Sequence, residues 1–421
     1  MASRPPLAIF DLSLAAIILC LTLVGGYVGG GYVAIPLAAL AGVATLRLLI
    51  GRQPLWLPGD VAALLLAAAF LLIAVAFALS ATSPGDLSYA LNFLVFAFAA
   101  PVGALLARQA TPRSLQIVAG LAVFGTLVGA AVAAYQVFAA GLPRATAFGS
   151  DPIWSSQAVV MIGFLASLGV LATRGPLRIV FLAGPAAALL VTVLSESRGA
   201  ALAVPVLALL VVVMGARLRW LALGITLGAA ALGLLLAWAV WPSGLQRIAG
   251  LFDIFRALLS GADLGEVSAN ERVLLYRAGI EAFVHNPWFG YGWTDRVNAI
   301  APFLPNGLAT FSSVHGHLHN DALDFAVIAG IPGLLAYLLI LAAPIAGALT
   351  APRDSQYRLR LLAATGLAVG YAIFGLTYLT FGYEYHTTLY VCFAAIILGF
   401  CRDAPPAPRT PSLAAGPASR P

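Results

Sequence analysis

Long apolar stretches, separated by short polar breaks, recur along nearly the whole chain. Each stretch is about 18 to 25 residues long, which is enough for a helix to cross a hydrocarbon core of roughly 30 Å. We therefore predict twelve membrane-spanning helices. Their approximate bounds are 7–25, 32–50, 61–79, 88–107, 114–139, 156–173, 177–194, 199–215, 220–240, 321–349, 361–381 and 385–401.

One segment, residues 241–320, breaks this rhythm because it is far longer than a typical connection between helices. Apolar residues from Leu245 to Leu259 recur at helical spacing with charged residues on other faces, which predicts an amphipathic helix in the membrane interface. The run Ser268-Ala-Asn-Glu271 is typical of a capping box. It predicts a second helix that ends at His285, before Asn286-Pro287.

Composition narrows the class of protein. Hydrophobic residues make up 62% of the chain and charged residues 9%, with a mean hydropathy of +0.98, whereas soluble domains carry about 25% charged residues. A soluble globular protein is excluded, and we predict an all-α polytopic membrane protein. Its parts are helices 1–9 in residues 1–240, the long loop at 241–320, helices 10–12 in 321–401 and a disordered, Pro- and Ala-rich tail at 402–421.

The positive charges indicate how the chain lies in the membrane. The net charge is +6, and all 22 basic residues are arginines. We expect the first apolar segment to be a retained helix and not a cleaved signal peptide. If the N-terminus is cytoplasmic, 15 of the 22 arginines fall in cytoplasmic loops or near the two ends, which is the positive-inside pattern. The long loop then lies on the outer side of the membrane. The basic balance reflects orientation and contact with membrane lipids, and predicts no nucleic-acid binding.

Seven arginines remain on the outer side, where orientation does not explain them. They are Arg144, Arg198, Arg247, Arg256, Arg272, Arg277 and Arg296. A guanidinium near membrane depth is costly and usually has an anionic partner. In Ser195-Glu-Ser-Arg198, that partner is either Glu196, in a structural pair, or a phosphate group, which the planar guanidinium fits well.

Two further arginine positions are candidates for anion binding. Arg272 and Tyr276 lie four residues apart and share one helix face, and Arg272 sits in the first turn, where backbone N–H groups add to an anion site. Arg277 lies about 100° further round the helix. Arg144 is a weaker candidate in a loop. A solvated surface position is the alternative for each of them.

A histidine-rich run, residues 313–324, ends the long loop and enters the tenth predicted span. Three of the five histidines of the chain are here, namely His315, His317 and His319. A neutral imidazole can take a proton from a sugar hydroxyl, which is worth about 10²–10⁴-fold in rate. The alternatives are histidines at a wet helix end, or a metal site with Asp321 and Asp324. The spacing matches no common zinc motif.

Taken together, several arginines and a histidine are expected on one face of a membrane whose lipids carry diphosphate groups. No nucleotide-binding loop, Ser-His-Asp pattern or paired-carboxylate motif is evident. This fits a donor that is already activated by its own leaving group. A lipid-linked diphosphate is therefore the expected ligand, with no cofactor and no metal. The three cysteines, Cys20, Cys392 and Cys401, match neither a zinc site nor a disulfide framework.

These residues resemble the O-antigen ligase (WaaL) superfamily. His319-Asn320, nine residues and then Gly330-Ile-Pro-Gly333 match its H[NSQ]-x9-G-x-x-G signature in every fixed position. Ser197-Arg198-Gly199 looks like its Ser-Arg-Gly element, and the block from Arg272 to Gly292 looks like its Arg, aromatic, Pro and Gly-x-Gly block. Phe148-Gly-Ser-Asp-Pro152 is a loose match to the family's Asn-Pro-Asn turn.

The resemblance implies a metal-independent, inverting glycosyltransferase of the GT-C type in the cell inner membrane. Its donor would be undecaprenyl-diphosphate-linked O-antigen, and its acceptor a sugar hydroxyl of the lipid A core. His319 would be the base, and Arg198 and Arg272 would hold the diphosphate. Further substrate-binding candidates are Arg144, Arg277, Tyr276, Asn320 and His317.

Other functions remain open at this point. The superfamily also contains O-antigen polymerases and protein O-oligosaccharyltransferases, which the motif separates imperfectly. A transporter for lipid-linked sugars is the alternative from another class. It would need a cytoplasm-facing counterpart of the outer arginines, and the sequence offers none.

Overall fold

A computed structural model describes residues 6–148, 151–214, 267–304 and 316–403, with three isolated positions at 231, 235 and 238. Within these ranges the ordered elements are helices, and no strand occurs. The first half contains α1 (Pro6–Leu23), α2 (Gly25–Val28), η1 (Gly30–Val33), α3 (Ala34–Ile50), α4 (Val61–Ser80), α5 (Pro84–Ser88), η2 (Tyr89–Phe98), α6 (Ala99–Ala107), α7 (Ser114–Ala134), η3 (Tyr135–Ala139), α8 (Pro152–Ala172), η4 (Pro176–Leu182), α9 (Ala183–Leu194) and α10 (Arg198–Met214). The second contains α13 (Val267–His285), α14 (Gly292–Ile300), η6 (Ala301–Phe303), α15 (Asp321–Thr350), α16 (Tyr357–Gly375), α17 (Glu384–Ala395) and η8 (Ile396–Phe400).

The helices agree with a protein that crosses a membrane many times. Among the described residues, eight helices are long and apolar enough to span, at Gly30–Ile50, Val61–Ser80, Pro84–Ala107, Ser114–Ala139, Pro152–Ala172, Pro176–Leu194, Asp321–Thr350 and Tyr357–Gly375. Shorter apolar helices, at Ala8–Leu23, Arg198–Met214 and Glu384–Phe400, coincide with three more predicted spans. The predicted span at 220–240 lies outside the described residues, apart from the three isolated positions.

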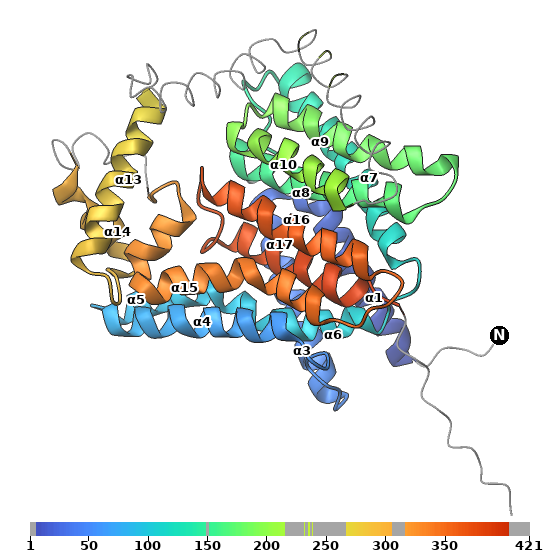
Figure 1. Ribbon diagram of the computed structural model, residues 1–421, viewed down its shortest axis with the longest axis horizontal. Helices are drawn as coiled ribbons and strands as arrows, with labels where there is room; N and C mark the ends of the chain where they lie inside the picture. Colours follow the sequence, from blue (N-terminus) through green and yellow to red (C-terminus); the bar gives the residue numbers. More distant parts are fainter. Residues whose placement is uncertain are drawn as a thin grey trace, which may run out of the picture.

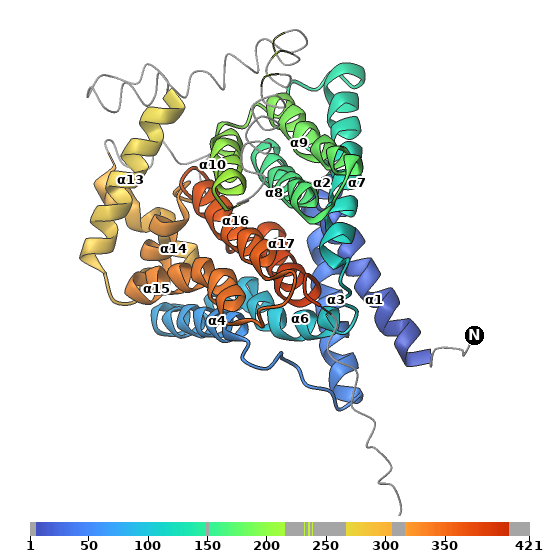
Figure 2. The same cartoon turned by 45° about the vertical axis from the view of Figure 1, so that its right-hand side comes forward.

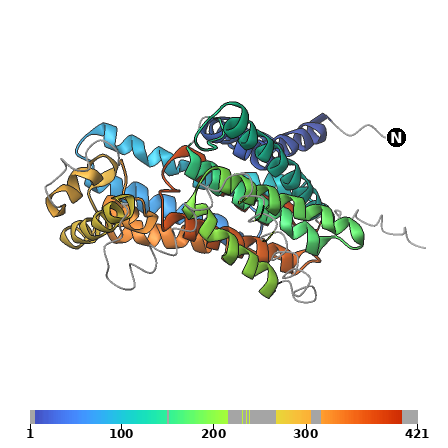
Figure 3. The same cartoon turned by 90° about the horizontal axis from the view of Figure 1, so that it is seen from above.

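The bundle is built around α16 and α17. Figures 1 and 2 show these two helices in the middle, with α4 and α15 along one side and α7, α8, α9 and α10 on the other. Helices α13 and α14 stand at the end of the molecule far from the N-terminus (Figure 3). The interior between the central helices is rich in buried aromatic rings, among them Phe325, Tyr371, Phe381 and Tyr390.

Helix α15 is broken in its interior at Gly330. Its φ of +62° is a left-handed conformation that glycine adopts without strain. The backbone groups freed by the break bond to the segment after α13, since the Ile331 amide donates to the Pro287 carbonyl at 2.7 Å. The Tyr291 amide donates in turn to Val327 at 2.8 Å. A Cβ at Gly330 would meet the Pro287 backbone at 2.5 Å, so the G-x-x-G part of the motif marks a close backbone crossing.

One predicted span is too long. Residues 361–381 were expected to form a single helix, but α16 ends at Gly375 and residues 376–383 form a turn before α17. The amides of Thr380 and Phe381 bond to the side chain of Asp321, at 2.8 and 3.4 Å, in place of helix carbonyls. The Thr380 hydroxyl bonds to the same carboxylate. This polar anchor holds the chain in a turn after the helix ends.

The predicted helix in the long loop is confirmed. Helix α13 ends at His285, directly before Asn286-Pro287. The side chains of residues 267–270 are not described, so the capping box predicted at Ser268–Glu271 is not tested. The helix expected at 245–259 and most of the tail, residues 404–421, lie outside the described residues. Buried apolar side chains join α13, the η6 region and α15 in a small second core. They are Leu275, Ala278, Ala282, Ile300, Leu304, Leu318 and Val327.

Candidate functional site

The turn at residues 376–383 is where the candidate residues meet. It lies against the N-terminal ends of α8, α10 and α15, and against α13. The Trp154 indole on α8 donates to the Leu379 carbonyl at 2.8 Å. A Cβ at Gly199 on α10 would collide with the Thr377 side chain, so only a glycine lets the start of α10 approach this closely. The turn therefore brings together segments that are far apart in sequence.

His319 lies just before α15, in the residue preceding its N-cap. Its φ of +53° is left-handed, and its side chain is buried, with 8% exposed. Its amide donates to Nδ1 of His317 at 3.1 Å, so the two histidines are joined through the backbone of His319. The Asn320 side chain caps α15 by accepting from the Leu323 amide at 3.1 Å.

The two imidazoles pack against an aromatic ring of the turn. Ring centroids of His317 and His319 are 4.2 Å apart, and both rings lie against Tyr378, at 4.9 and 5.1 Å. The Tyr378 hydroxyl donates to Asp151 Oδ2 at 2.9 Å. Burial and the nearby Asp151 carboxylate raise the pKa of Tyr378. The hydroxyl therefore keeps its proton and its hydrogen bond at neutral pH, which fixes the ring beside both histidines.

Helix α13 supplies the next pair of candidates. The Tyr276 hydroxyl lies 3.0 Å from the carbonyls of both His319 and Leu376, and so links α13 to the histidine segment and to the turn. Burial raises the pKa of Tyr276, while the charge of Arg272 and a hydrogen bond with the Asn320 side chain oppose the shift. Arg272 and Asn320 therefore lie beside Tyr276. Arg277 is exposed on another face of the helix.

Arg144 and Arg198 lie at the turn that starts α10, whereas Arg247 and Arg256 lie outside the described residues. Arg144 donates from Nε to the Ser195 carbonyl at 2.8 Å and from Nη2 to the Glu196 carbonyl at 3.4 Å. Glu196 has a φ of +52°, so the turn is tight. Arg198 is half-buried and begins α10, next to Gly199 and the 376–383 turn. Arg144 thus holds the segment from which Arg198 projects.

Several site residues escaped the sequence analysis, chiefly Asp151, Trp154, Tyr378 and Tyr383. Asp151 caps α8 by accepting from Ile153 and Trp154 at 2.7 and 2.8 Å, in addition to its bond from Tyr378. It occupies the loose match to the Asn-Pro-Asn turn. Two features of the sequence could have indicated these residues. One is that loose match, and the other is the run of Thr and Tyr residues at 377–383, which interrupts an otherwise apolar stretch.

The two acidic residues of the histidine run, Asp321 and Asp324, bind other groups of the protein. Asp321 holds the 376–383 turn, and Asp324 pairs with Arg296 at 3.1 Å. Within the described ranges, no three His, Cys, Asp or Glu side chains gather as metal ligands would. His315 lies outside the described residues.

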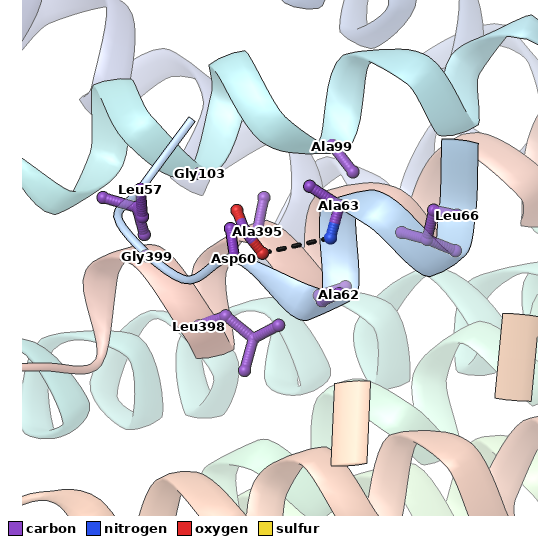
Figure 4. Close-up of a pocket in the computed structure, with 11 residues that line it drawn as sticks. Leu57, Asp60, Ala62, Ala63, Leu66, Ala99, Gly103, Ala395, Leu398 and Gly399 are labelled. Carbon is purple, nitrogen blue, oxygen red and sulfur yellow. Dashed lines mark hydrogen bonds between the residues drawn. The ribbon is translucent and has the colours of Figure 1, made fainter. Parts of the chain in front are cut away.

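A pocket at the far end of α15 is separate from this site. It is lined mainly by small apolar residues of α4, α6 and α17 around Asp60, which caps α4 by accepting from Ala63 (Figure 4). Ala62 packs against Gly347, near the C-terminal end of α15, whereas His319 precedes its N-terminal end. The pocket and the histidines therefore lie at opposite ends of the same helix.

Comparison with known proteins agrees with the geometry. Residues 183–338 match the family model described as O-antigen ligase. No curated protein matches the chain significantly. The matched stretch runs from α9 into α15 and includes Arg198, Arg272 and His319. This match over residues 183–338 supports the resemblance to the O-antigen ligase and polymerase superfamily that the sequence motifs predicted.

Proposed function

We propose that this protein is an O-antigen ligase of the bacterial inner membrane. It transfers O-antigen from undecaprenyl diphosphate to a sugar hydroxyl of the lipid A core, at the periplasmic face. One observation carries the proposal. The turn at residues 376–383 brings together His319, the Arg272–Tyr276 face of α13 and the start of α10, where Arg198 lies. A base and two guanidinium groups around one turn suit transfer from a diphosphate donor.

In the proposed reaction, His319 takes the proton of the acceptor hydroxyl as its oxygen attacks the anomeric carbon of the glycan. The bond from that carbon to the diphosphate oxygen breaks, and undecaprenyl diphosphate leaves with the negative charge. Arg198 and Arg272 bind the diphosphate and stabilise this charge, which grows in the transition state. Attack opposite the leaving group inverts the anomeric centre.

The other candidates have roles around these three. His317 lies beside His319, with ring centroids 4.2 Å apart, and in the proposed reaction it contacts a sugar of the substrate. Tyr276 and Asn320 keep the arginine helix and the histidine segment together. Arg144 acts through the turn that carries Arg198. Arg277, being exposed, is placed to meet a charged part of a substrate outside the cluster.

A gel of the lipopolysaccharide from a deletion strain distinguishes a ligase from a polymerase. Deletion of a ligase removes all long-chain material from the gel and leaves the lipid A core, whereas deletion of a polymerase leaves core with a single repeat unit. Complementation with the wild-type gene and with His319→Ala gives the matched control. Long chains in the deletion strain would contradict both functions.

A further inference from the structure

Arg296 on α14 is a buried arginine with no substrate role in the reaction above. Its side chain is 4% exposed, and its guanidinium lies 4.0 Å over the ring of Trp293. Nε donates to the Gly316 carbonyl at 2.6 Å, and Nη2 to the Tyr383 hydroxyl at 3.1 Å. Nη1 donates to Asp324 at 3.1 Å. All three nitrogens are used within the protein, which explains this outer-side arginine without a phosphate.

The partners of Arg296 lie on both sides of the histidines. Gly316 precedes His317, and Asp324 accepts through its other oxygen from the Leu318 amide at 3.1 Å. The Arg296–Asp324 pair therefore fixes the backbone at positions 316 and 318. Tyr383 belongs to the turn against which the imidazoles pack, and its ring lies 6.4 Å from that of His317.

The backbone of His319 needs such support. A non-glycine residue at a φ of +53° is in a sparsely populated conformation, which persists only when its surroundings determine it. A buried ion pair is a poor source of stability, because hydrophobic replacements of both partners are often neutral or stabilising. Holding a strained segment in one geometry is a role that a hydrophobic pair cannot fill, since it has no donors for Gly316 and no acceptor for Leu318.

We propose that Arg296, with Asp324, is a positioning residue that holds the His317–His319 segment in its reactive geometry. The inference rests on the proposed function for the role of His319. Misplacing a catalytic group by about 1 Å costs on the order of 10²-fold in rate. Loss of the clamp should therefore lower the turnover number and leave donor binding, which depends on Arg198 and Arg272, nearly unchanged.

The chain contains a matched control at the other end of the bundle. Arg360 is also fully buried, pairs with Asp354 at 2.9 Å and donates to the carbonyls of Pro352 and Cys401, at 2.6 and 3.1 Å. Asp354 follows the C-terminal end of α15, whereas His319 precedes its N-terminal end. Variants of this pair report the cost of disturbing a buried arginine clamp without touching the histidines.

The test compares Arg296→Lys and the double variant R296M/D324N, which removes both charges, with Arg360→Lys and R360M/D354N, in the full-length protein reconstituted in liposomes. Turnover of lipid-linked glycan is measured per folded molecule, together with KM for the donor. Independently of activity, the rate of His319 modification by diethylpyrocarbonate is followed by mass spectrometry. The double variants keep the experiment interpretable if a lone buried aspartate prevents folding.

We expect both Arg296 variants to lose about 10²-fold in turnover and to keep KM within about twofold. His319 should also be modified faster. The Arg360 variants should change only the yield of folded protein. Wild-type turnover and modification rate in folded Arg296 variants would overturn the inference. If the wild type transfers no glycan while the modification rates still differ, the proposed function fails and the positioning role stands.

Discussion

Replacement of His319 by glycine and by alanine separates its chemical role from its backbone role. Both substitutions remove the imidazole, and with it general-base help worth about 10²–10⁴-fold, or roughly 3–5 kcal/mol of transition-state stabilisation. Donor affinity should stay nearly unchanged in both, because the base acts in the transition state while the arginines hold the diphosphate.

The two variants should differ in stability. His319 has a φ of +53°, and a left-handed backbone costs an L-residue about 1–2 kcal/mol, a cost that glycine escapes. Glycine loses more conformational freedom on folding, which offsets about 0.4–1 kcal/mol of this gain. His319→Gly should therefore be more stable than His319→Ala by roughly 0.5–1 kcal/mol, although both are inactive.

The assay combines glycan transfer in liposomes with denaturant unfolding of the same preparations. Near-normal transfer by either variant would refute the base assignment, and the base would then have to be sought among Asp321, Asp324 and Glu196. Equal stability of the glycine and alanine variants would refute the argument from backbone strain, and would leave the chemistry untouched.

Four further outcomes are expected. Arg198→Ala or Arg272→Ala should weaken donor binding and turnover together, and lysine should rescue poorly because it lacks the bidentate fork; donor titrations and initial rates check this. A reporter enzyme fused within residues 241–320 should be active only outside the cytoplasm. Transfer should persist in excess EDTA, and a loss reversed by zinc or magnesium would revive the metal site. Tyr276→Phe should cost about 0.5–1.5 kcal/mol in unfolding free energy and should also lower turnover, since its hydroxyl joins α13 to His319.

Hydropathy predicts the helices well, because crossing a membrane imposes length and composition on each segment locally. It failed at residues 376–381, where the helix ends. The turn there is held by a bond to Asp321, about 60 positions earlier in the chain, and no local pattern could identify this partner. The Thr and Tyr residues within the apolar stretch were a local sign of a break, but averaging hydropathy over the window removed it.

The candidate site was predictable to the extent that it follows from spacing. Arg272 and Tyr276 share a helix face by periodicity, and the structure places Tyr276 against the His319 carbonyl. Asp151 and Tyr378 act through a contact between distant segments, which periodicity cannot supply. Arg296 was noticed as an arginine on the outer side, but its partner Asp324 could be identified only in three dimensions.

The break in α15 at Gly330 also has a consequence for insertions and deletions. Nine residues separate Asn320, which caps the helix, from Gly330, where the helix crosses the Pro287 segment. Each residue of a helix advances it by about 1.5 Å and turns it by about 100°. One inserted residue would therefore swing His319 a quarter turn or more away from Tyr276, or else push the break off its contact. The length of this short segment is therefore fixed by geometry at both of its ends.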